Sequence, residues 1–293
     1  YDCFMFYDED LVIDLRLNIL NEHVHEFVIV ESKFTHSGKK RELLFDINKY
    51  SKFKNKINYI VLENEPEDLE KVHDNDTDDK KNSKYIMNAL KRENFQRNGI
   101  KKGLTNAEPG DLILVSDVDE IPNLSNLDLN EINDNIILFK QNFYYYKFNL
   151  KLEDMPWFGT KGCKYKNLKS PQWLRNIKDK KYPFWRLDVL FSDKKYSNIK
   201  FIDNGGWHFS NMKTPEEIEK KMRTYLHHRE YDIKPLGTKK IEEMIKSKKS
   251  IYNLRADMKN EKIDGTQNLK ATDGRELPEY LKKNKTKYSN WIE

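Results

Sequence analysis

A short apolar run that ends in clustered carboxylates constrains this chain of 293 residues more than any other feature. The run covers residues 112–115, and it is followed by Asp117, Asp119 and Glu120 before Pro122 ends the strand. Such a strand fixes the separation of two carboxylates, whose oxygens suit a hard divalent cation. Ligands of open α/β sheets bind at the carboxyl ends of strands. The pattern is therefore typical of a metal site in an α/β fold and equally of a solvated acidic turn.

The Asp-x-Asp pattern alone has little weight, because it occurs four times in the chain. The pairs are Asp8/Asp10, Asp74/Asp76, Asp76/Asp78 and Asp117/Asp119. The first follows a short aromatic strand, and the middle two lie in a polar tract with no strand before them. Only Asp117/Asp119 follows a long strand of buried type, and this context makes it the metal candidate.

The N-terminal third alternates strands and a helix in the way that is typical of a parallel sheet. The apolar patterns predict strands over residues 1–6, 27–31 and 57–62 and a helix over residues 11–20. A strand, a helix and a strand at this spacing indicate βαβ units. We therefore expect an α/β fold with a mixed, mainly parallel sheet flanked by helices.

The remaining elements follow from the same kinds of pattern. They are a polar loop over residues 63–84, helices over 85–104, 215–229, 239–248 and 278–291, strands over 136–146, 184–191 and 199–202, and an irregular aromatic segment over 155–185. No internal repeat and no interdomain linker is evident. We expect one domain over residues 1–293, with a helical C-terminal extension over 236–293.

The composition is that of a chain with a very polar surface. Hydrophobic residues make up 37%, and 53 Lys and Arg against 48 Asp and Glu give a net charge of +5. The two signs are interleaved, and no basic block accompanies a nucleic-acid-binding module, so no nucleic-acid partner is expected. No run of 18 apolar residues is present, so we expect no membrane span in this chain. Cys3 and Cys163 define neither a disulfide framework nor a zinc site.

A second notable segment is Gly205-Gly206-Trp207-His208. Paired glycines allow the backbone to take a positive φ or to approach a ligand closely. A neutral histidine is a common ligand of divalent metals, which makes His208 a candidate ligand. The alternative is a tight turn with a packed Trp207 and a hydrogen-bonded His208, and the residues alone favour it.

Two polar groups could bind a phosphate or another polar ligand. Glu31 ends a strand and precedes a basic loop that contains Lys39. Arg92, Gln96 and Arg97 lie on the helix that precedes the acidic strand. An ordinary turn and a solvated helix face are the alternatives, and for the helix the solvated face is favoured.

Aromatic residues gather between positions 143 and 185. Aromatic faces can cover the apolar face of a pyranose while nearby polar groups pair with its hydroxyls. Most of these residues are expected in the core. Trp157 and Trp173, which polar and basic residues flank, are the better candidates for stacking on a sugar.

Taken in order, several segments resemble glycosyltransferase family 17, which includes the β-1,4-mannosyl-glycoprotein β-1,4-N-acetylglucosaminyltransferase. The matching segments are Tyr1-Asp2-Cys3-Phe4, Asp14-Leu15-Arg16-Leu17, Val30-Glu31-Ser32 with Phe34-Thr35 and Gly38-Lys39, Arg92 with Gln96-Arg97-Asn98, Asp117 to Pro122, Gly206 to Ser210, His228 with Glu230, and Leu277-Pro278-Glu279-Tyr280-Leu281. They span nearly the whole chain. Each is modest alone, but the ordered set is specific.

The resemblance implies a Rossmann-like fold of GT-A type with the Asp-x-Asp at a strand end. It implies a UDP-sugar donor with N-acetylglucosamine as the sugar, Mn²⁺ or Mg²⁺ as cofactor, inversion at the anomeric carbon, and a glycan or glycoconjugate acceptor. Residues 1–135 would bind the nucleotide sugar, and residues 136–235 the metal and acceptor. Residues 147–200 match the animal enzyme poorly, so acceptor recognition is expected there and specificity for N-glycans is not carried over.

The resemblance also suggests roles for single residues. Asp119 would bind the metal directly, Asp117 would bind it through water or hold the ribose, and His208 would complete the shell. Candidates for binding the donor nucleotide are Glu31, Lys39, Arg92, Arg97, Asp117 and Trp207. An inverting displacement needs a general base, usually a carboxylate. The candidates for that base are Glu120, Asp188 and Glu230.

Two other functions stay open at this point. Haloacid-dehalogenase-like phosphohydrolases also end a strand in Asp-x-Asp and use the first aspartate as nucleophile. They prefer Thr or Val where Ile121 stands, and their motif usually ends the first strand, whereas about 110 residues precede it here. A non-catalytic carbohydrate-binding protein is the other alternative. The compartment also stays open: the cytoplasm is expected of a bacterial or viral protein, and the Golgi lumen if an N-terminal anchor has been removed.

Overall fold

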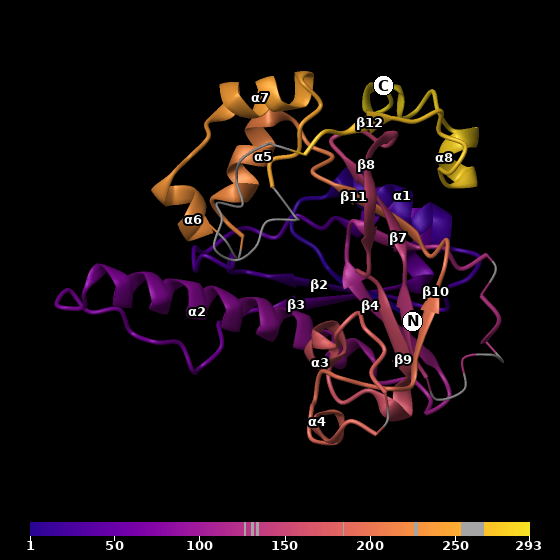
Figure 1. The fold of residues 1–293 in the computed structure, drawn as a ribbon, viewed down its shortest axis with the longest axis horizontal. Coiled ribbons are helices and arrows are strands. Elements are labelled where there is room, and N and C mark those ends of the chain that lie inside the picture. The colour runs from indigo at the N-terminus through magenta and orange to yellow at the C-terminus, as the bar shows by residue number, and fades with distance from the viewer. Residues whose placement is uncertain (126, 130–131, 133–134, 184, 226–227, 253–266) are drawn as a thin grey trace.

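The computed structural model describes residues 1–293 except 126, 130–131, 133–134, 184, 226–227 and 253–266, and it leaves out the side chains of residues 154, 187, 190, 230 and 233. In the described chain the larger sheet has seven strands (Figure 1). Their spatial order is β10 (Ile199–Ile202), β6 (Ile136–Phe139), β9 (Lys161–Lys164), β4 (Leu112–Asp117), β1 (Asp2–Met5), β2 (Phe27–Ser32) and β3 (Ile57–Leu62). Neighbours are parallel except that β9 runs antiparallel between β6 and β4.

Both faces of this sheet are buried, because successive side chains of a strand point to opposite faces. Phe4 of β1 packs on the side of α1 (Asp10–Leu20). Its neighbour Cys3 packs on the other side, which η2 (Gly99–Gly103) covers where it follows α2 (Asp78–Asn98). Continuous apolar runs such as those of β2 and β4 are what a parallel sheet with two covered faces requires.

A smaller mixed sheet lies beside the first. Its five described strands, in spatial order, are β12 (Lys270–Ala271), β8 (Leu150–Trp157), β7 (Gln141–Tyr145), β11 (Gly206–Ser210) and β5 (Glu120–Pro122). β7 and β11 are parallel, and the other neighbours are antiparallel. Only Val118 and Asp119 separate the end of β4 from the start of β5, so the Asp-x-Asp segment connects the two sheets.

The helices of the C-terminal half cover the smaller sheet (Figure 1). Ile218 of α5 (Pro215–Met222) and Ile241 of α7 (Thr238–Lys246) pack on the aromatic side chains of β7. The other described helices are η1 (Ile47–Lys56), η4 (Tyr165–Asn167), α3 (Pro171–Asn176), α4 (Leu187–Leu190), α6 (His228–Ile233), α8 (Glu279–Lys283) and η5 (Ser289–Trp291). Among the described residues, no helix combines the length and apolar character that a membrane span needs.

The predicted α/β fold with a mainly parallel sheet is confirmed, but two predicted strands are wrong. The strand predicted over 136–146 is two strands, because the chain changes sheets at Lys140: β6 joins the larger sheet and β7 the smaller. The strand predicted over 184–191 contains α4 instead, and residue 184 lies outside the described residues. An alternation of apolar side chains over so few residues suits a short helix as well as a strand.

The boundaries of several other elements also differ from the predictions. The segment over 155–185, predicted to be irregular, contains the end of β8, all of β9 and α3. α2 begins inside the predicted loop 63–84, because the Thr77 side chain accepts a hydrogen bond from the Lys80 backbone N–H and caps the helix. The helix predicted over 215–229 ends at Met222, and α6 follows separately. The predicted helical extension over 236–293 also contains β12, which pairs with β8.

Candidate active site

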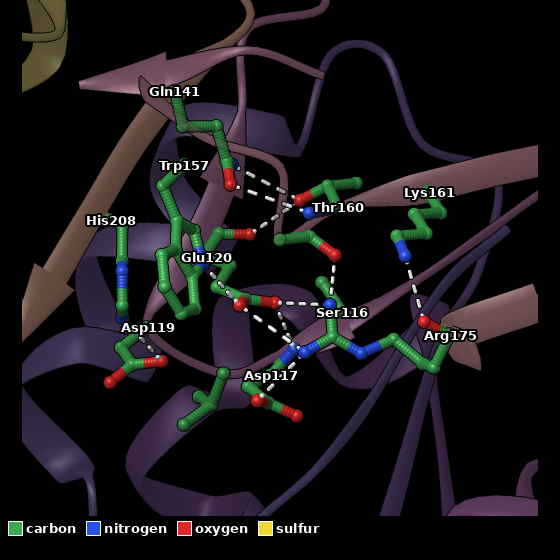
Figure 2. Close-up of polar contacts among 12 residues, drawn as sticks. Ser116, Asp117, Asp119, Glu120, Gln141, Trp157, Thr160, Lys161, Arg175 and His208 are labelled. Atoms are coloured by element: carbon green, nitrogen blue, oxygen red, sulfur yellow. Dashed lines mark hydrogen bonds and ion pairs between the residues drawn. The ribbon is translucent and has the colours of Figure 1, made fainter. Parts of the chain in front are cut away.

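The Asp-x-Asp segment lies at the carboxyl end of a strand, as the sequence predicts. Asp117 is the last residue of β4, and it is in register with Met5 at the end of β1. The chain then turns through Asp119 into β5, where Glu120 is opposite His208 of β11. The turn therefore brings the predicted metal-binding side chains to one edge of the two sheets (Figure 2).

A fully buried arginine on α1 holds this turn in place. The Arg16 guanidinium forms a bidentate ion pair with Asp2, with distances of 2.6 and 2.7 Å. It also donates to the backbone carbonyls of Asp117, Val118 and Glu120 at 3.0–3.1 Å. A guanidinium presents its donors in fixed directions, so it can fix the path of a turn. Arg16 thus positions the acidic turn without contacting the carboxylates of Asp117 and Glu120.

Glu120 braces the same turn from inside the protein (Figure 2). Its Oε2 accepts hydrogen bonds from the Asp117 backbone N–H at 2.8 Å and from Arg175 at 2.9 Å, and its Oε1 accepts one from the Trp157 indole at 2.7 Å. A Cβ on Gly159 would lie 2.2 Å from Glu120 Cδ, so this fit requires glycine. Because both oxygens are engaged and the residue is 1% exposed, the geometry favours a structural role for Glu120.

Asp117 is neutralised by two arginines. Its carboxylate pairs with Arg97 at 3.1 Å and with Arg175 at 3.0 Å, while 39% of the side chain stays exposed. Burial alone would raise the pKa of Asp117, but the charges of Arg175 and Arg97 outweigh it and hold the pKa below its usual range. Asp117 is therefore ionised at neutral pH, with its charge balanced by the protein.

Asp119 and His208 lie next to each other. The distance from His208 Nε2 to Asp119 Oδ1 is 3.6 Å. The His208 ring stacks on Trp157, with centroids 4.9 Å apart, and meets Phe143 edge-on at 4.2 Å. Its Nδ1 is buried and has no hydrogen-bond partner among the described residues. Burial would raise the pKa of Asp119, but the neighbouring His208 outweighs the effect of burial and lowers that pKa.

The close approach of β11 to β5 depends on Gly206. Its φ is +128°, and a Cβ at this position would lie 2.1 Å from the Ile121 carbonyl oxygen. The positive φ predicted for the paired glycines is confirmed at Gly206, whereas the close approach there is to the backbone of β5 and not to a ligand. The backbone N–H of Phe209 then donates to the Asp119 carbonyl at 2.8 Å. β11 therefore fixes the backbone of Asp119 beside His208.

A cavity of about 300 Å³ opens over these residues, and we call it the first cavity. Its volume is within the range of small-molecule sites. It lies where the sheet order reverses, since β2 and β3 extend from one side of β1 and β4 lies on the other. Ligands of α/β folds bind at such switch points. Its lining includes Phe6, Tyr7, Thr35, His36, Gln96, Arg97, Asp117, Asp119, Glu120, Trp157, His208, Lys221 and Tyr225.

Asp119 and His208 are the described residues best placed to bind a divalent metal. A carboxylate oxygen and a neutral imidazole are both suitable ligands for Mn²⁺. The described residues contain no group of three or more His, Cys, Asp or Glu side chains arranged to hold a metal. Within the described part of the chain, two donors are thus available without a closed shell, which fits a cation that takes its other ligands from substrate phosphates and water.

A comparison with protein families agrees with this geometry. The model of glycosyltransferase family 17 matches residues 1–292. The chain belongs to glycosyltransferase family 17. It is therefore a glycosyltransferase, an enzyme that uses a sugar donor and a glycan acceptor, and the phosphohydrolase hypothesis loses its support. A search of curated proteins gave no significant match.

Two residues that the sequence predicts at the donor site, Glu31 and Trp207, do not line the first cavity and instead form contacts within the protein. Glu31 is fully buried, pairs with Arg41 at 2.8 Å and accepts hydrogen bonds from the Tyr59 hydroxyl and two backbone amides. Trp207 points to the opposite side of β11 from His208, packs in the core and donates to a backbone carbonyl at 2.6 Å. Their polar groups have partners within the protein, so neither is presented to a ligand.

The two outer cationic candidates also lie away from the first cavity. Lys39 is exposed and does not contribute to the lining. Arg92 pairs with Glu65 at 2.5 Å and fills the space under Gly38. Of the three residues predicted on that helix face, Gln96 and Arg97 reach the cavity and Arg92 does not.

Of the other two candidates for the general base, Asp188 does not line the first cavity. Asp188 lies on the surface in α4, paired with Arg186 at 2.9 Å and Lys195 at 2.7 Å. Hydrogen bonds from Arg186 and Lys195 lower the pKa of Asp188 to about 2. Glu230 belongs to α6, and its side chain lies outside the described residues.

The structure adds residues that the sequence reasoning missed. Arg175 of α3 comes from a segment with no clear periodicity, so no signal pointed to it. Glu9, at the start of α1, and Lys221, in α5, also line the cavity. Charged residues are common at such helix positions, so the sequence did not single them out. Arg16 did have a signal, because it is a charged residue between the apolar Leu15 and Leu17 of α1.

The two tryptophans that were predicted to stack on a sugar have different positions. Trp157 lines the first cavity and contacts both His208 and Glu120. Trp173 instead donates to the Tyr196 hydroxyl at 3.0 Å and packs beside the larger sheet. Only Trp157 is therefore placed, among the described residues, where a bound sugar could reach it in this cavity.

Proposed function

We propose that this glycosyltransferase moves a sugar from a UDP-sugar to a carbohydrate hydroxyl with inversion at the anomeric carbon, and that Mn²⁺ or Mg²⁺ binds at Asp119 and His208. The observation that supports this most is the 3.6 Å between Asp119 Oδ1 and His208 Nε2 at the wall of the first cavity. Two ligands about 2.1 Å from one cation lie roughly 3.0–4.2 Å apart, depending on the angle between them. The bound cation would offset the negative charge of the departing diphosphate.

The protein's own cations support a diphosphate in the same place. Arg97 and Lys221 both line the first cavity, one from α2 and the other from α5. Arg97 is nearly buried and is held by Glu93 at 2.7 Å as well as by Asp117. A held guanidinium stabilises a developing negative charge without reorganising. We infer that Arg97 and Lys221 contact the phosphates.

The end of the cavity over β1 and β2 suits the nucleoside. Tyr7, Thr35 and His36 line it, and they offer an aromatic ring, a hydroxyl and an imidazole. Burial lowers the pKa of His36, so the ring is neutral at neutral pH. Its Nε2 donates to the Gln96 side-chain oxygen at 3.1 Å, so the other ring nitrogen can accept a hydrogen bond from uracil or ribose. We therefore propose that these residues contact the nucleoside, in place of the sequence candidates Glu31, Lys39 and Arg92.

The sugar itself is proposed on two grounds. Trp157 lies beside His208 at the cavity wall, where its ring can cover the apolar face of a pyranose. N-acetylglucosamine is the sugar that the family resemblance implies. We propose it as the donor sugar, with UDP-glucose and UDP-galactose as the alternatives to be screened.

A thermal-shift screen tests the donor proposal. UDP, UDP-N-acetylglucosamine, UDP-glucose and UDP-galactose would each be added with Mn²⁺, with Mg²⁺ and with EDTA. We expect metal-dependent stabilisation by one UDP-sugar in the wild type, loss of it in Asp119→Asn and His208→Asn, and no change in Asp193→Asn, whose exposed carboxylate pairs with Lys169. Equal stabilisation in EDTA would refute the metal site. No response to any UDP compound would refute the donor, and metal-independent binding of free sugars would favour a carbohydrate-binding protein.

A further inference from the structure

A second cavity of about 260 Å³ adjoins the first cavity. Four residues line both of them: Glu9, Asp119, Asn211 and Lys221. Asp119 therefore stands at the junction, so a diphosphate bound there would present the anomeric carbon near the opening between the cavities. A displacement with inversion needs the attacking hydroxyl on the side away from the leaving group, and the second cavity provides room for it.

The lining of the second cavity has the character of a sugar site. Apolar surface comes from Trp291, Phe209 and Met212, and polar groups come from Asn211 and Lys213. Sugar sites combine an aromatic or apolar surface for the pyranose face with a few polar groups for its hydroxyls. The second cavity is built by the start of α1, the turn at Asp119, the end of β11, α5 and η5, and none of these belongs to the predicted acceptor region 147–200.

Several carboxylates line the second cavity, and three of them are committed to partners. Asp8 pairs with Lys213 at 2.5 Å, Asp10 pairs with Lys49 at 2.5 Å, and Glu217 accepts a hydrogen bond at the N-terminus of α5. Asp119 faces His208. The remaining carboxylate among the described lining residues is Glu9.

Glu9 is held in a way that leaves one oxygen for a ligand. Its Oε2 accepts hydrogen bonds from the backbone N–H groups of Tyr7 and Asp8, both at 3.0 Å. No described residue donates a hydrogen bond to its Oε1 or forms an ion pair with it. Burial raises the pKa of Glu9, against the charge of Lys213, which lowers it. A carboxylate of raised pKa is a better proton acceptor than an ordinary one.

We propose that the second cavity binds the carbohydrate acceptor and that Glu9 is the general base of the transfer. In this step the acceptor O–H bond breaks and its proton goes to Glu9. The acceptor oxygen forms a bond to the anomeric carbon, and the bond from that carbon to the phosphate oxygen breaks. The electron pair leaves with the nucleoside diphosphate. This assignment rests on the proposed function. It identifies an acceptor site, and it replaces Glu120 and Asp188 as candidates for the general base.

The first experiment compares Glu9→Gln with the wild type, using water as the acceptor. The amide oxygen of Gln can still accept the Tyr7 and Asp8 hydrogen bonds, so the loop keeps its anchor. We expect release of UDP from the UDP-sugar to fall about 100-fold or more, while the affinity for the metal and UDP-sugar stays within about twofold. Glu243→Gln, an exposed residue paired with Lys240, is the matched control. UDP release within a few-fold of the wild type would overturn the assignment of the base.

The same measurements separate this inference from the donor proposal. If Glu9→Gln folds, by its circular dichroism melt, but loses UDP-sugar affinity as well, Glu9 belongs to the donor site and the inference fails while the donor proposal stands. If the wild type does not bind any UDP-sugar, both fail. For the cavity, Trp291→Ala is assayed with a panel of p-nitrophenyl β-glycosides as acceptors. We expect the KM of the best acceptor to rise about tenfold with the KM of the donor unchanged, and an unchanged acceptor KM would overturn the cavity assignment.

Discussion

Replacing Arg16 by methionine should both destabilise the protein and weaken its donor site. The side chain is fully buried, and its removal leaves Asp2 as a buried carboxylate without its ion pair. Breaking one partner of a buried pair costs about 3–5 kcal/mol. Three backbone carbonyls of the Asp117–Glu120 turn would lose a donor as well. Total stability of a domain is about 5–15 kcal/mol, so the variant should fold, but only marginally.

A double-mutant cycle separates the ion pair from the turn. Asp2→Asn removes the carboxylate charge but leaves Arg16 bound to the turn, so we expect it to cost less than Arg16→Met. The double variant should recover part of the loss, because no buried charge remains, with a coupling energy of about 1–3 kcal/mol. Its turn carbonyls would still lack a donor, so its affinity for the metal and UDP should stay below that of Asp2→Asn.

Urea unfolding followed by circular dichroism measures the stability terms, and titration calorimetry with UDP and Mn²⁺ measures the donor site. A cost below about 1 kcal/mol for Arg16→Met would contradict the burial argument. Full recovery of UDP affinity in the double variant would show that Arg16 matters only to stability, and the positioning role would have to be abandoned.

Three further predictions concern the surroundings of the site. Burial lowers the pKa of Lys161 to about 8, so the folded protein binds fewer protons than the unfolded chain between about pH 8 and 10.4. Its free energy of unfolding should therefore rise with pH across that window. Urea melts at pH 8 and 10 should show this rise in the wild type and not in Lys161→Met. Gly159→Ala would push its Cβ into Glu120 and should lower both the melting temperature and the affinity for UDP. An unchanged affinity would contradict the role of Glu120 in holding the acidic turn. Gly206→Ala should cost about 2 kcal/mol or more, since a backbone carbonyl blocks the methyl, and wild-type stability would contradict it.

The acidic strand end could be predicted because every signal for it is local. Four apolar residues, two aspartates and a proline lie within a few positions, and strand direction alone brings them to the ligand edge of a sheet. His208 could be named but not placed, because its neighbour Trp207 must point to the other face of β11. The sequence does not say which face meets the cavity, and this is why Trp207 was predicted at the site and lies in the core.

The contacts that depend on tertiary packing could not be predicted. Arg175 is 55 positions from Glu120 in the chain, and the two meet because β9 inserts antiparallel beside β4 and brings α3 back to the turn. Glu31 was predicted to face a nucleotide, but Arg41 and the segment after it fold back over its carboxylate. A carboxylate at a strand end has the same sequence pattern whether it meets a ligand or the protein's own amides.

The most direct test of the proposed donor site is the binding of Mn²⁺ in the presence of UDP, measured from the paramagnetic resonance signal of free Mn²⁺. We predict one UDP-dependent Mn²⁺ site per chain in the wild type and in Asp193→Asn. We predict that Asp119→Asn and His208→Asn each weaken it by about tenfold or more. Mn²⁺ and UDP bound as tightly by both variants as by the wild type would show that the metal does not lie between Asp119 and His208, and the account of this site would be wrong.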